Sequence, residues 1–285
     1  MRNALLAISI LLLLPSLNAA FATESILITY SDTMNNVVFD GKWTDKLEWK
    51  QSSWDKLSSP NGDTLHIRSA HQGNFIYILL DVVGEESIDH ISDKAMVCID
   101  GLNDKTSIAG ADDYCFLASL DSKQGFVYQG GSSLALNGHF KKITSSDGFI
   151  GVGGKSDQND KYSYIPHTSY EFKIPLNLFG RSDVYGFYVL VYDASGNQYY
   201  SWPAGIDPDS PFDIPSPSNW GNLVSPDKSI PEFNLPILAL VPAIFLVIYF
   251  TRMKKLGHKI RLNVGQLVES DETTFLQKQK KLRLK

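Results

Sequence analysis

The chain has 285 residues, of which 43% are hydrophobic and 20% are charged, and its net charge is −5. The charge is divided unevenly. Residues 23–251 carry 15 basic and 28 acidic residues, a net charge of −13, whereas residues 252–285 carry 10 and 3, a net charge of +7. Such an acidic main part disfavours nucleic acid as a partner, because the phosphate backbone would be repelled. It favours cations, neutral sugars or basic proteins, and it also suits a protein that must stay soluble in a salty medium.

Residues 1–22 have the pattern of a secretory signal peptide. A positive start at Arg2 precedes an apolar run over residues 4–17, and residues 20–22 match the small-x-small cleavage pattern. The mature chain is therefore expected to begin at Thr23. The alternative is an uncleaved anchor helix, which Pro15 and the small residues disfavour.

Residues 23–202 are predicted to form one all-β domain, a two-sheet antiparallel sandwich of jelly-roll type. Strand patterns recur with turns rich in Gly, Asn, Asp and Ser between them, and about 170 residues are enough to bury a two-sheet core. Besides a hairpin over residues 64–83, the expected strands lie near residues 36–40, 95–100, 113–120, 125–129, 139–144, 148–153, 168–175 and 185–193.

The predicted hairpin turns at Gln72-Gly73. With that loop, Arg68 would lie opposite Tyr77, and His66 would lie opposite Leu79, on one face of the sheet. The residues that alternate with them are aliphatic and are expected to face the core. One face of the hairpin is therefore predicted to be apolar, and the other to mix polar and aromatic groups.

The two cysteines, Cys98 and Cys115, both fall in the exported part, where disulfides persist. Each lies in a strand-like run. If these runs pair antiparallel across residues 101–111, the two side chains lie opposite each other within reach of a bond. A disulfide is expected, with two buried free thiols as the alternative. No further cysteine or histidine stands at the short spacing that a cysteine-based metal site requires.

Residues 203–229 are predicted to form a stalk between the domain and the membrane. Residues 203–231 hold 7 of the 13 prolines, and such a run has few donors for a sheet and favours extended conformations. Phe212 and Trp220 indicate that part of this stalk docks onto the domain.

Residues 230–251 have the pattern of a transmembrane helix. About 20 apolar residues cross a ~30 Å hydrocarbon core, and prolines such as Pro236 and Pro242 are tolerated in such spans. Basic residues follow at once, which places residues 252–285 in the cytoplasm by the positive-inside rule. The expected location is therefore a single-pass cell-membrane protein with its large domain outside.

The run Ser229-Ile230-Pro231-Glu232-Phe233, together with the apolar and basic residues after it, resembles the archaeal PEF-type C-terminal sorting signal. This resemblance implies that a membrane peptidase cuts near the motif and transfers the protein to a lipid anchor. The chain departs from the pattern because its tail runs on to Lys285. Cleavage and a permanent transmembrane anchor are both kept as alternatives.

Two stretches resemble the carbohydrate-binding module family 9-like group of DOMON-like sandwiches. The first is Val37 to Trp43, with an Asp40-Gly41 turn and with Glu48-Trp49 following. The second is Tyr170 to Leu176, a strand that ends in Ile-Pro-Leu, followed by the strand 186–193. The resemblance implies a β-sandwich. Some members of this group hold sugars between aromatic rings and others hold a b-type haem, so it leaves the ligand open.

Sugar binding requires exposed aromatic faces with hydrogen-bonding groups beside them. The alternative for the hairpin is that Arg68 simply stacks over Tyr77 on a solvated face. Trp49 is expected in the core because of its place in the family pattern. The candidate ligand-binding residues are Trp43, Trp54, His66, Arg68, Tyr77 and Trp202.

Acidic loops suggest a structural calcium ion, which relatives of this group often carry. Calcium takes six to eight oxygen ligands, and no EF-hand spacing is present. A second acidic group stands at residues 157–160, and solvated turn carboxylates are the alternative at both places. The candidate calcium ligands are Asp100, Asn103, Asp104, Asp112 and Asp113.

Haem b is the alternative cofactor. It would need two axial ligands that face one cavity, and no Cys-x-x-Cys-His motif is present for covalent attachment. The available side chains are Met96, His71, His90, His139 and His167.

The sequence contains no catalytic signature such as Gly-x-Ser-x-Gly, His-Glu-x-x-His, a P-loop or a dinucleotide fingerprint. The leading hypothesis is a non-enzymatic module at the cell surface that binds an extracellular glycan. The alternatives are a membrane-anchored haem protein in electron transfer and a structural or adhesive envelope protein.

Overall fold

The computed structural model describes residues 24–229, except residues 88, 90, 91, 145 and 212, and in addition Leu276. The chain divides into two units, Met1–Ser229 and Ile230–Lys285. The predicted signal peptide and membrane segment, and the basic tail apart from Leu276, lie outside the described residues. None of the helices in the part that is described has the length and apolarity to cross a bilayer.

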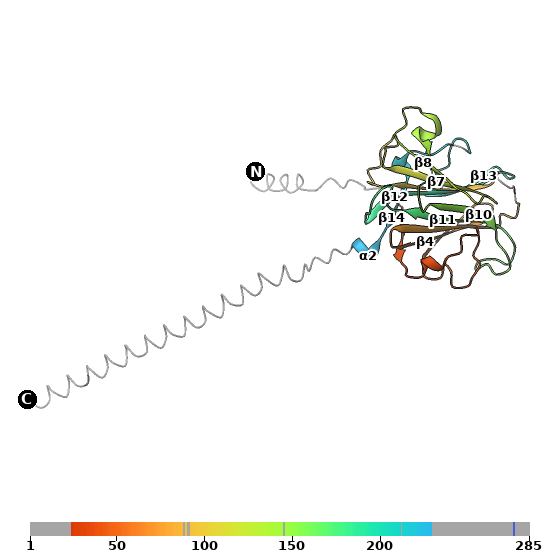
Figure 1. Cartoon of the computed structure of the whole chain (residues 1–285), viewed down its shortest axis with the longest axis horizontal. Helices are drawn as coiled ribbons and strands as arrows, with labels where there is room; N and C mark the ends of the chain where they lie inside the picture. Colours follow the sequence, from red (N-terminus) through yellow and green to blue (C-terminus); the bar gives the residue numbers. More distant parts are fainter. Residues whose placement is uncertain are drawn as a thin grey trace, which may run out of the picture. The chain divides into compact units, whose positions relative to one another are not determined.

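Two β-sheets lie face to face and form a sandwich (Figure 1). The first sheet has eight strands in the order β1-β14-β12-β6-β7-β8-β9, with β13 also paired to β12. Their bounds are Ser25–Leu27 (β1), Gly221–Val224 (β14), Val184–Asp193 (β12), Lys94–Asp100 (β6), Asp113–Ser119 (β7), Phe126–Gln129 (β8), Lys141–Ile143 (β9) and Gln198–Trp202 (β13).

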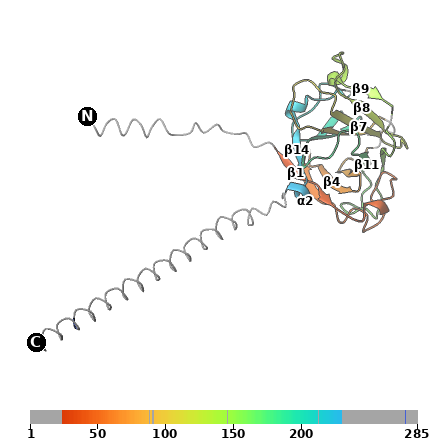
Figure 2. The ribbon, with the colours of Figure 1, turned by 60° about the vertical axis from the view of Figure 1, so that its left-hand side comes forward.

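The second sheet has six strands in the order β10-β11-β5-β4-β2, with β3 also paired to β4. The strand bounds are Ile150–Lys155 (β10), Thr168–Pro175 (β11), Phe75–Val83 (β5), Thr64–Gln72 (β4), Thr29–Tyr30 (β2) and Ser53–Ser58 (β3). The helices described in this unit are short: η1 Met34–Asn36, η2 Leu136–His139, η3 Pro217–Asn219 and α2 Pro226–Ser229. Figure 2 shows the two layers from the side of β1 and β14.

The main hydrophobic core lies between the sheets. Alternate residues of each strand point inward, so Ile67 and Ile78 of one sheet meet Val97 and Phe187 of the other, all at 1% exposure or less. Burial of such side chains stabilises the fold by roughly 1.5–3 kcal/mol each. The prediction of an all-β, two-sheet domain is confirmed.

The structure corrects the prediction that both sheets are purely antiparallel. β1 pairs with β14 in parallel, and β2 pairs with β4 in parallel. The strand predicted at residues 36–40 is also wrong, because η1 and an irregular turn occupy this stretch. The expected strands near 95–100, 113–120, 125–129, 168–175 and 185–193 are confirmed within one or two residues.

The hairpin of β4 and β5 turns at Gly73-Asn74, and not at Gln72-Gly73 as predicted. Arg68 therefore lies opposite Leu79, and His66 lies opposite Asp81. The error shifts the pairing by two residues. Because side chains alternate with a period of two, the predicted faces are kept although every predicted partner is wrong.

The predicted stalk at residues 203–229 is wrong at residues 221–224, which belong to the domain. Residues 221–224 form β14, which lies between β1 and β12 inside the eight-stranded sheet. The sequence prediction gave weight to the prolines, but none of them falls within these four residues. The domain therefore extends at least to Val224.

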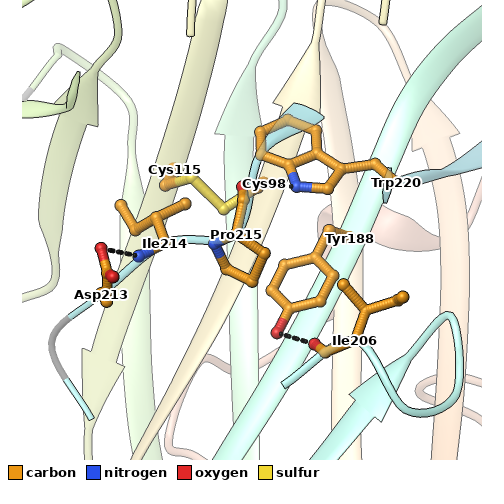
Figure 3. Close-up of a disulfide and its surroundings, with 8 residues drawn as sticks. All are labelled: Cys98, Cys115, Tyr188, Ile206, Asp213, Ile214, Pro215 and Trp220. Atoms are coloured by element: carbon orange, nitrogen blue, oxygen red, sulfur yellow. Dashed lines mark hydrogen bonds between the residues drawn. A yellow bond between two sulfur atoms is a disulfide. The ribbon is translucent and has the colours of Figure 1, made fainter. Parts of the chain in front are cut away.

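The described part of residues 203–220 lies over the outer face of the eight-stranded sheet (Figure 3). Tyr188 donates its hydroxyl to the carbonyl of Ile206 at 2.7 Å, and the Trp220 indole N–H bonds the carbonyl of Pro215 at 3.0 Å. The Tyr188 and Trp220 rings stack at 6.2 Å. The expected docking of Trp220 is confirmed, whereas Phe212 lies outside the described residues.

Cys98 and Cys115 form a disulfide under this segment (Figure 3). They lie directly opposite each other in the antiparallel pair β6 and β7, with 4.1 Å between their Cα atoms. Both are fully buried in a second apolar cluster that includes Trp220 and Ile214. The predicted disulfide is confirmed.

Candidate functional site

The candidate site lies on the outer face of the six-stranded sheet. Two segments cover this face: residues 37–52, which precede β3, and residues 156–167, which join β10 to β11. Side chains of β4 and β5 that point away from the main core meet these segments. They form a further apolar cluster, in which Tyr77 and Leu79 of β5 pack with Trp43 and Trp49 of the 37–52 segment. The face predicted to mix polar and aromatic groups is therefore largely covered.

A buried carboxylate fixes the 37–52 segment to the sheet. The carboxylate of Glu171 on β11 accepts the backbone N–H groups of Asp40 and Gly41 at 3.0 and 2.9 Å, and the indole N–H of Trp49 at 3.0 Å. Gly41 has φ +85°, and a Cβ there would lie 2.4 Å from the backbone nitrogen of Gly154. The Asp-Gly turn is thus held both by hydrogen bonds and by close backbone approach.

Arg68 is the centre of the site. Its Nε donates to the Tyr162 hydroxyl at 2.6 Å, and its Nη1 donates to the carbonyl of Ser52 at 3.1 Å. The guanidinium carbon lies 5.3 Å from the ring centre of Trp43 and 5.6 Å from that of Trp54. A guanidinium among rings at these distances makes cation–π contacts, so Arg68 is held in one orientation.

An aromatic row stands beside Arg68. Tyr162 stacks on His66 with 3.7 Å between ring centres, and Trp54 donates its indole N–H to His66 Nδ1 at 3.0 Å. Burial lowers the pKa of His66 to about 4, so its imidazole is neutral and can accept this bond. Burial also raises the pKa of Tyr162 to about 12, which keeps its hydroxyl protonated. Trp54 closes the row with 49% of its surface exposed.

A cleft of about 600 Å³ opens between the two covering segments. Its most buried lining residues are Trp43, Arg68 and Asp160, and its rim includes Tyr164, which is 82% exposed. The volume is typical of a pocket for a small organic ligand. The lining residues are Trp43, Lys46, Leu47, Lys50, Arg68, Gln158, Asn159, Asp160, Lys161 and Tyr164.

The six predicted ligand-binding residues are only partly brought together. Trp43 and Arg68 line the cleft, and Trp54 and His66 stand behind Arg68. Tyr77, which is 1% exposed, packs in the apolar cluster beneath the 37–52 segment. Trp202, which is 7% exposed, packs in the main core against Gly221. Neither of these two rings offers a free face to a ligand.

Several lining residues escaped the sequence analysis. Tyr164 and the amides of Gln158 and Asn159 line the cleft, and Tyr162 bonds to Arg68 beside it. All four come from one segment that looked like an acidic turn. The density of aromatic and amide side chains over residues 158–164 was a usable signal. The lysines at the rim gave no such signal in the sequence, because only the fold brings the two segments together.

A buried ion pair lies beneath the cleft. His167 Nε2 is 2.5 Å from Asp81 Oδ1 and 3.8 Å from Asp160 Oδ1, and His167 Nδ1 lies 2.7 Å from the carbonyl of Ile165. Burial alone would lower the pKa of His167, but the contact with Asp81 outweighs it and raises the pKa to about 9. Burial raises the pKa of Asp81 to about 7. Two ligands of a tetrahedral zinc ion would stand about 3.3 Å apart, so the shorter distance indicates an ion pair.

Three of the five predicted calcium ligands come together. Asp100, Asp112 and Asp113 each offer an oxygen within 4.8 Å of the others at the end of the β6–β7 pair. Asp113 Oδ1 and Asn103 Oδ1 are buried and have no hydrogen-bond partner within the described residues. Asp104 is exposed and is absent from this group, and its carboxylate accepts the backbone N–H of Thr106.

The predicted haem ligands occupy separate surroundings. Met96 packs beside the disulfide, His71 pairs with Asp227 at 3.1 Å, and His167 pairs with Asp81. His139 contacts the carbonyl of Ser132, and His90 lies outside the described residues. The structure thus brings no two of the described candidates to one haem position.

No family model matches the sequence, and no curated protein matches it. Among solved structures, the fold is similar to a carbohydrate-binding module of family 9 from Caldicellulosiruptor kristjanssonii, in complex with glucose in one structure and with cellotriose in another. The TM-scores are 0.46 and 0.45, and the identity is 14% in both cases. The match covers 71% of this chain and 95% and 93% of the two modules. A likeness at this level concerns the fold and assigns no function to this chain.

Proposed function

We propose that this chain is a non-catalytic carbohydrate-binding module that is held at the cell surface through its C-terminal segment. The observation that carries the binding function is the exposed ring of Tyr164 at the rim of a cleft whose floor contains Trp43 and Arg68. Sugar C–H faces pack on rings, and sugar hydroxyls need donors and acceptors. Gln158 and Asn159 supply both kinds of group on the same wall.

Binding is tested with the purified full-length protein on a glycan array that holds neutral and acidic oligosaccharides. Tyr164→Ala should weaken binding of every recognised glycan by about tenfold, because the loss of one stacking ring removes roughly 1–1.5 kcal/mol. Tyr30→Ala is the matched control, since Tyr30 is also exposed but does not line the cleft. If no glycan binds, or if both variants behave like the parent protein, the proposed function is wrong.

The proposed location rests on the sequence of the two ends of the chain. The signal pattern of residues 1–22 and the apolar residues 230–251 support export followed by anchoring. The Cys98–Cys115 disulfide supports an oxidising compartment. Protease added to intact cells should digest the domain, and mass spectrometry of the native protein should distinguish a retained C-terminus from cleavage near Glu232. Protection of the domain from the protease would contradict this location.

We include a structural calcium ion in the proposal, at Asp100, Asp112 and Asp113 with Asn103. Carboxylate and amide oxygens are suitable calcium ligands. The buried Asp113 and Asn103 oxygens lack a hydrogen-bond partner among the described residues, which supports a cation at this place. No observation favours haem, and a Soret absorption band in the purified protein would contradict the carbohydrate proposal in favour of the haem alternative.

A further inference from the structure

Positive charge is concentrated in the cleft of an otherwise acidic domain. Residues 23–251 carry only 15 basic residues against 28 acidic ones, yet four of the 15 line this one cleft. Lys46 and Lys50 lie on one wall, Lys161 lies on the other, and Arg68 lies at the floor. Lysine and arginine side chains are charged at neutral pH, so the cleft opposes the charge of the domain that contains it.

The acidic groups near the cleft are already engaged. Asp160 is the only acidic residue among the described residues that line the cleft, and it is buried. Its Oδ1 accepts the backbone N–H groups of Tyr162 and Ser163 and lies 3.8 Å from His167 Nε2. Asp157 pairs with Lys42 at 2.6 Å. These carboxylates therefore leave most of the positive charge of the cleft uncompensated.

Two further carboxylates of the 37–52 segment bond to backbone groups. Glu48 is buried and accepts the N–H groups of Val38 and Thr44 at 2.6 and 2.9 Å, and Asp45 accepts that of Leu47 at 2.8 Å. Within the described residues, no carboxylate forms an ion pair with the three lysines of the cleft.

Unpaired cations that converge on one concave site repel each other, and they attract anions because a cleft focuses the field. Arg68 is held by Tyr162 and Ser52, so it presents a fixed donor, whereas the lysines are adaptable point charges. The net charge of −13 over residues 23–251 opposes a long polyanion such as nucleic acid. The arrangement therefore suits a short ligand with few negative charges and with faces that stack on rings.

We infer that the cleft selects acidic saccharides, whose sugar rings carry carboxylate or sulfate groups. This inference rests on the proposed carbohydrate binding and adds the class of sugar. The sugar ring would pack at Tyr164 and Trp43, and the anionic substituent would lie between Lys46, Lys50 and Lys161.

The test compares ligands that differ only in charge. Oligogalacturonate is compared with the same oligomer fully methyl-esterified, and sulfated dextran oligomers are compared with dextran oligomers. At low ionic strength, the full-length protein should bind one or both charged forms about tenfold more tightly than the uncharged counterpart, and high salt should remove the preference. A preference for one charged probe alone identifies the substituent as carboxylate or sulfate, and a preference for both shows that the cleft accepts either.

The double variant Lys46→Gln, Lys50→Gln should lose most of this preference, because it should weaken the binding of charged oligomers more than that of neutral ones. Lys123→Gln with Lys155→Gln is the control, because both lysines are exposed and lie outside the cleft. Tyr164→Ala should weaken charged and neutral forms alike.

Equal binding of charged and uncharged oligomers would overturn the acidic class and leave carbohydrate binding intact. Charged binding that is insensitive to Tyr164→Ala, or that a short DNA oligomer matches, would show a general anion surface and would also overturn the inference. Absence of binding to all four probes and to the glycan array would count against the proposed function itself.

Discussion

Trp49 donates its indole N–H to the carboxylate of Glu171 at 3.0 Å, which joins two residues that are 122 positions apart. The same carboxylate accepts both N–H groups of the Asp40-Gly41 turn. One buried side chain of the sheet therefore sets the position of the segment that carries Trp43, Lys46 and Lys50. The wall of the cleft is thus tied to the rigid part of the fold.

Gly41→Ala should strongly destabilise the domain, by roughly 2–3 kcal/mol or more. The φ of +85° strains any side chain, and the added Cβ would lie 2.4 Å from the backbone of Gly154, which cannot move freely. Gly180→Ala is the matched control, because Gly180 has φ +82° with no atom within 4 Å of the added Cβ, so it should cost only about 1 kcal/mol. Urea unfolding of both variants measures the difference, and equal losses would show that close approach at Gly41 does not matter.

Stability should fall as the pH rises from about 6.5 to about 9. The pKa of His167 rises from 6.5 to about 9 in the folded protein, and that of Asp81 is also raised, so the folded chain holds protons more tightly than the unfolded chain. The contribution of His167 is then fully present below about pH 6.5 and is lost toward about pH 9, a change of roughly 3 kcal/mol. Urea unfolding across this range measures the slope.

The double variant Asp81→Asn, His167→Gln should flatten most of that slope, because it removes both charges together. A smaller slope should remain from Glu171, whose pKa burial raises to about 8. Asp81→Asn alone should flatten the slope as well, because without the carboxylate burial lowers the pKa of His167 and leaves its imidazole neutral at neutral pH. A double variant with an unchanged slope would contradict the assignment to this pair.

Removal of the disulfide by Cys98→Ala with Cys115→Ala should lower the free energy of unfolding by about 3 kcal/mol, as expected for a loop of this size, since the two cysteines are 17 residues apart. Reductant should bring the parent protein to the value of the variant and leave the variant unchanged. Since Trp220 covers the buried disulfide, Trp220→Ala should also speed its reduction. A reductant effect on the cysteine-free variant would locate the sensitivity elsewhere.

Calcium should raise the free energy of unfolding, by about 2.7 kcal/mol at a hundredfold excess over its dissociation constant. Asp113→Asn should abolish this response. In chelator, the same variant should be more stable than the parent, because it relieves repulsion from Asp100 and Asp112. Asp147→Asn is the control, as Asp147 is exposed outside this group. A normal calcium response in Asp113→Asn, measured by thermal unfolding, would exclude this site.

The sandwich was predictable from the sequence because its strands follow local patterns of alternating residues. Alternation placed Ile67 and Arg68 on opposite faces, and a strand pair with matching cysteines gave the disulfide. The turn of the first hairpin was misplaced by one residue. The predicted faces of its strands are still correct, because the pairing register shifted by two residues. β14 was missed because it has only four residues after a proline-rich run.

The candidate site was predictable only in part. Trp54, His66 and Arg68 share one face of neighbouring strands, which the sequence pattern indicates. Tyr77 belongs to the same face, but the 37–52 segment covers it, and local patterns do not show such cover. The approach of Lys46 and Lys50 to Lys161 depends on contacts across more than 100 positions of sequence. Long-range contacts of this kind cannot be recognised from local sequence patterns.

The place of β14 limits where the chain can be cut without loss of part of the domain. β14 pairs with β1 on one side and with the first residues of β12 on the other. It follows proline-rich residues whose sequence suggests a target for a protease. A cut between Trp202 and Gly221 would therefore detach a strand from within the sheet and uncover Tyr188 and the disulfide. A cut that leaves the domain intact must therefore fall beyond Val224.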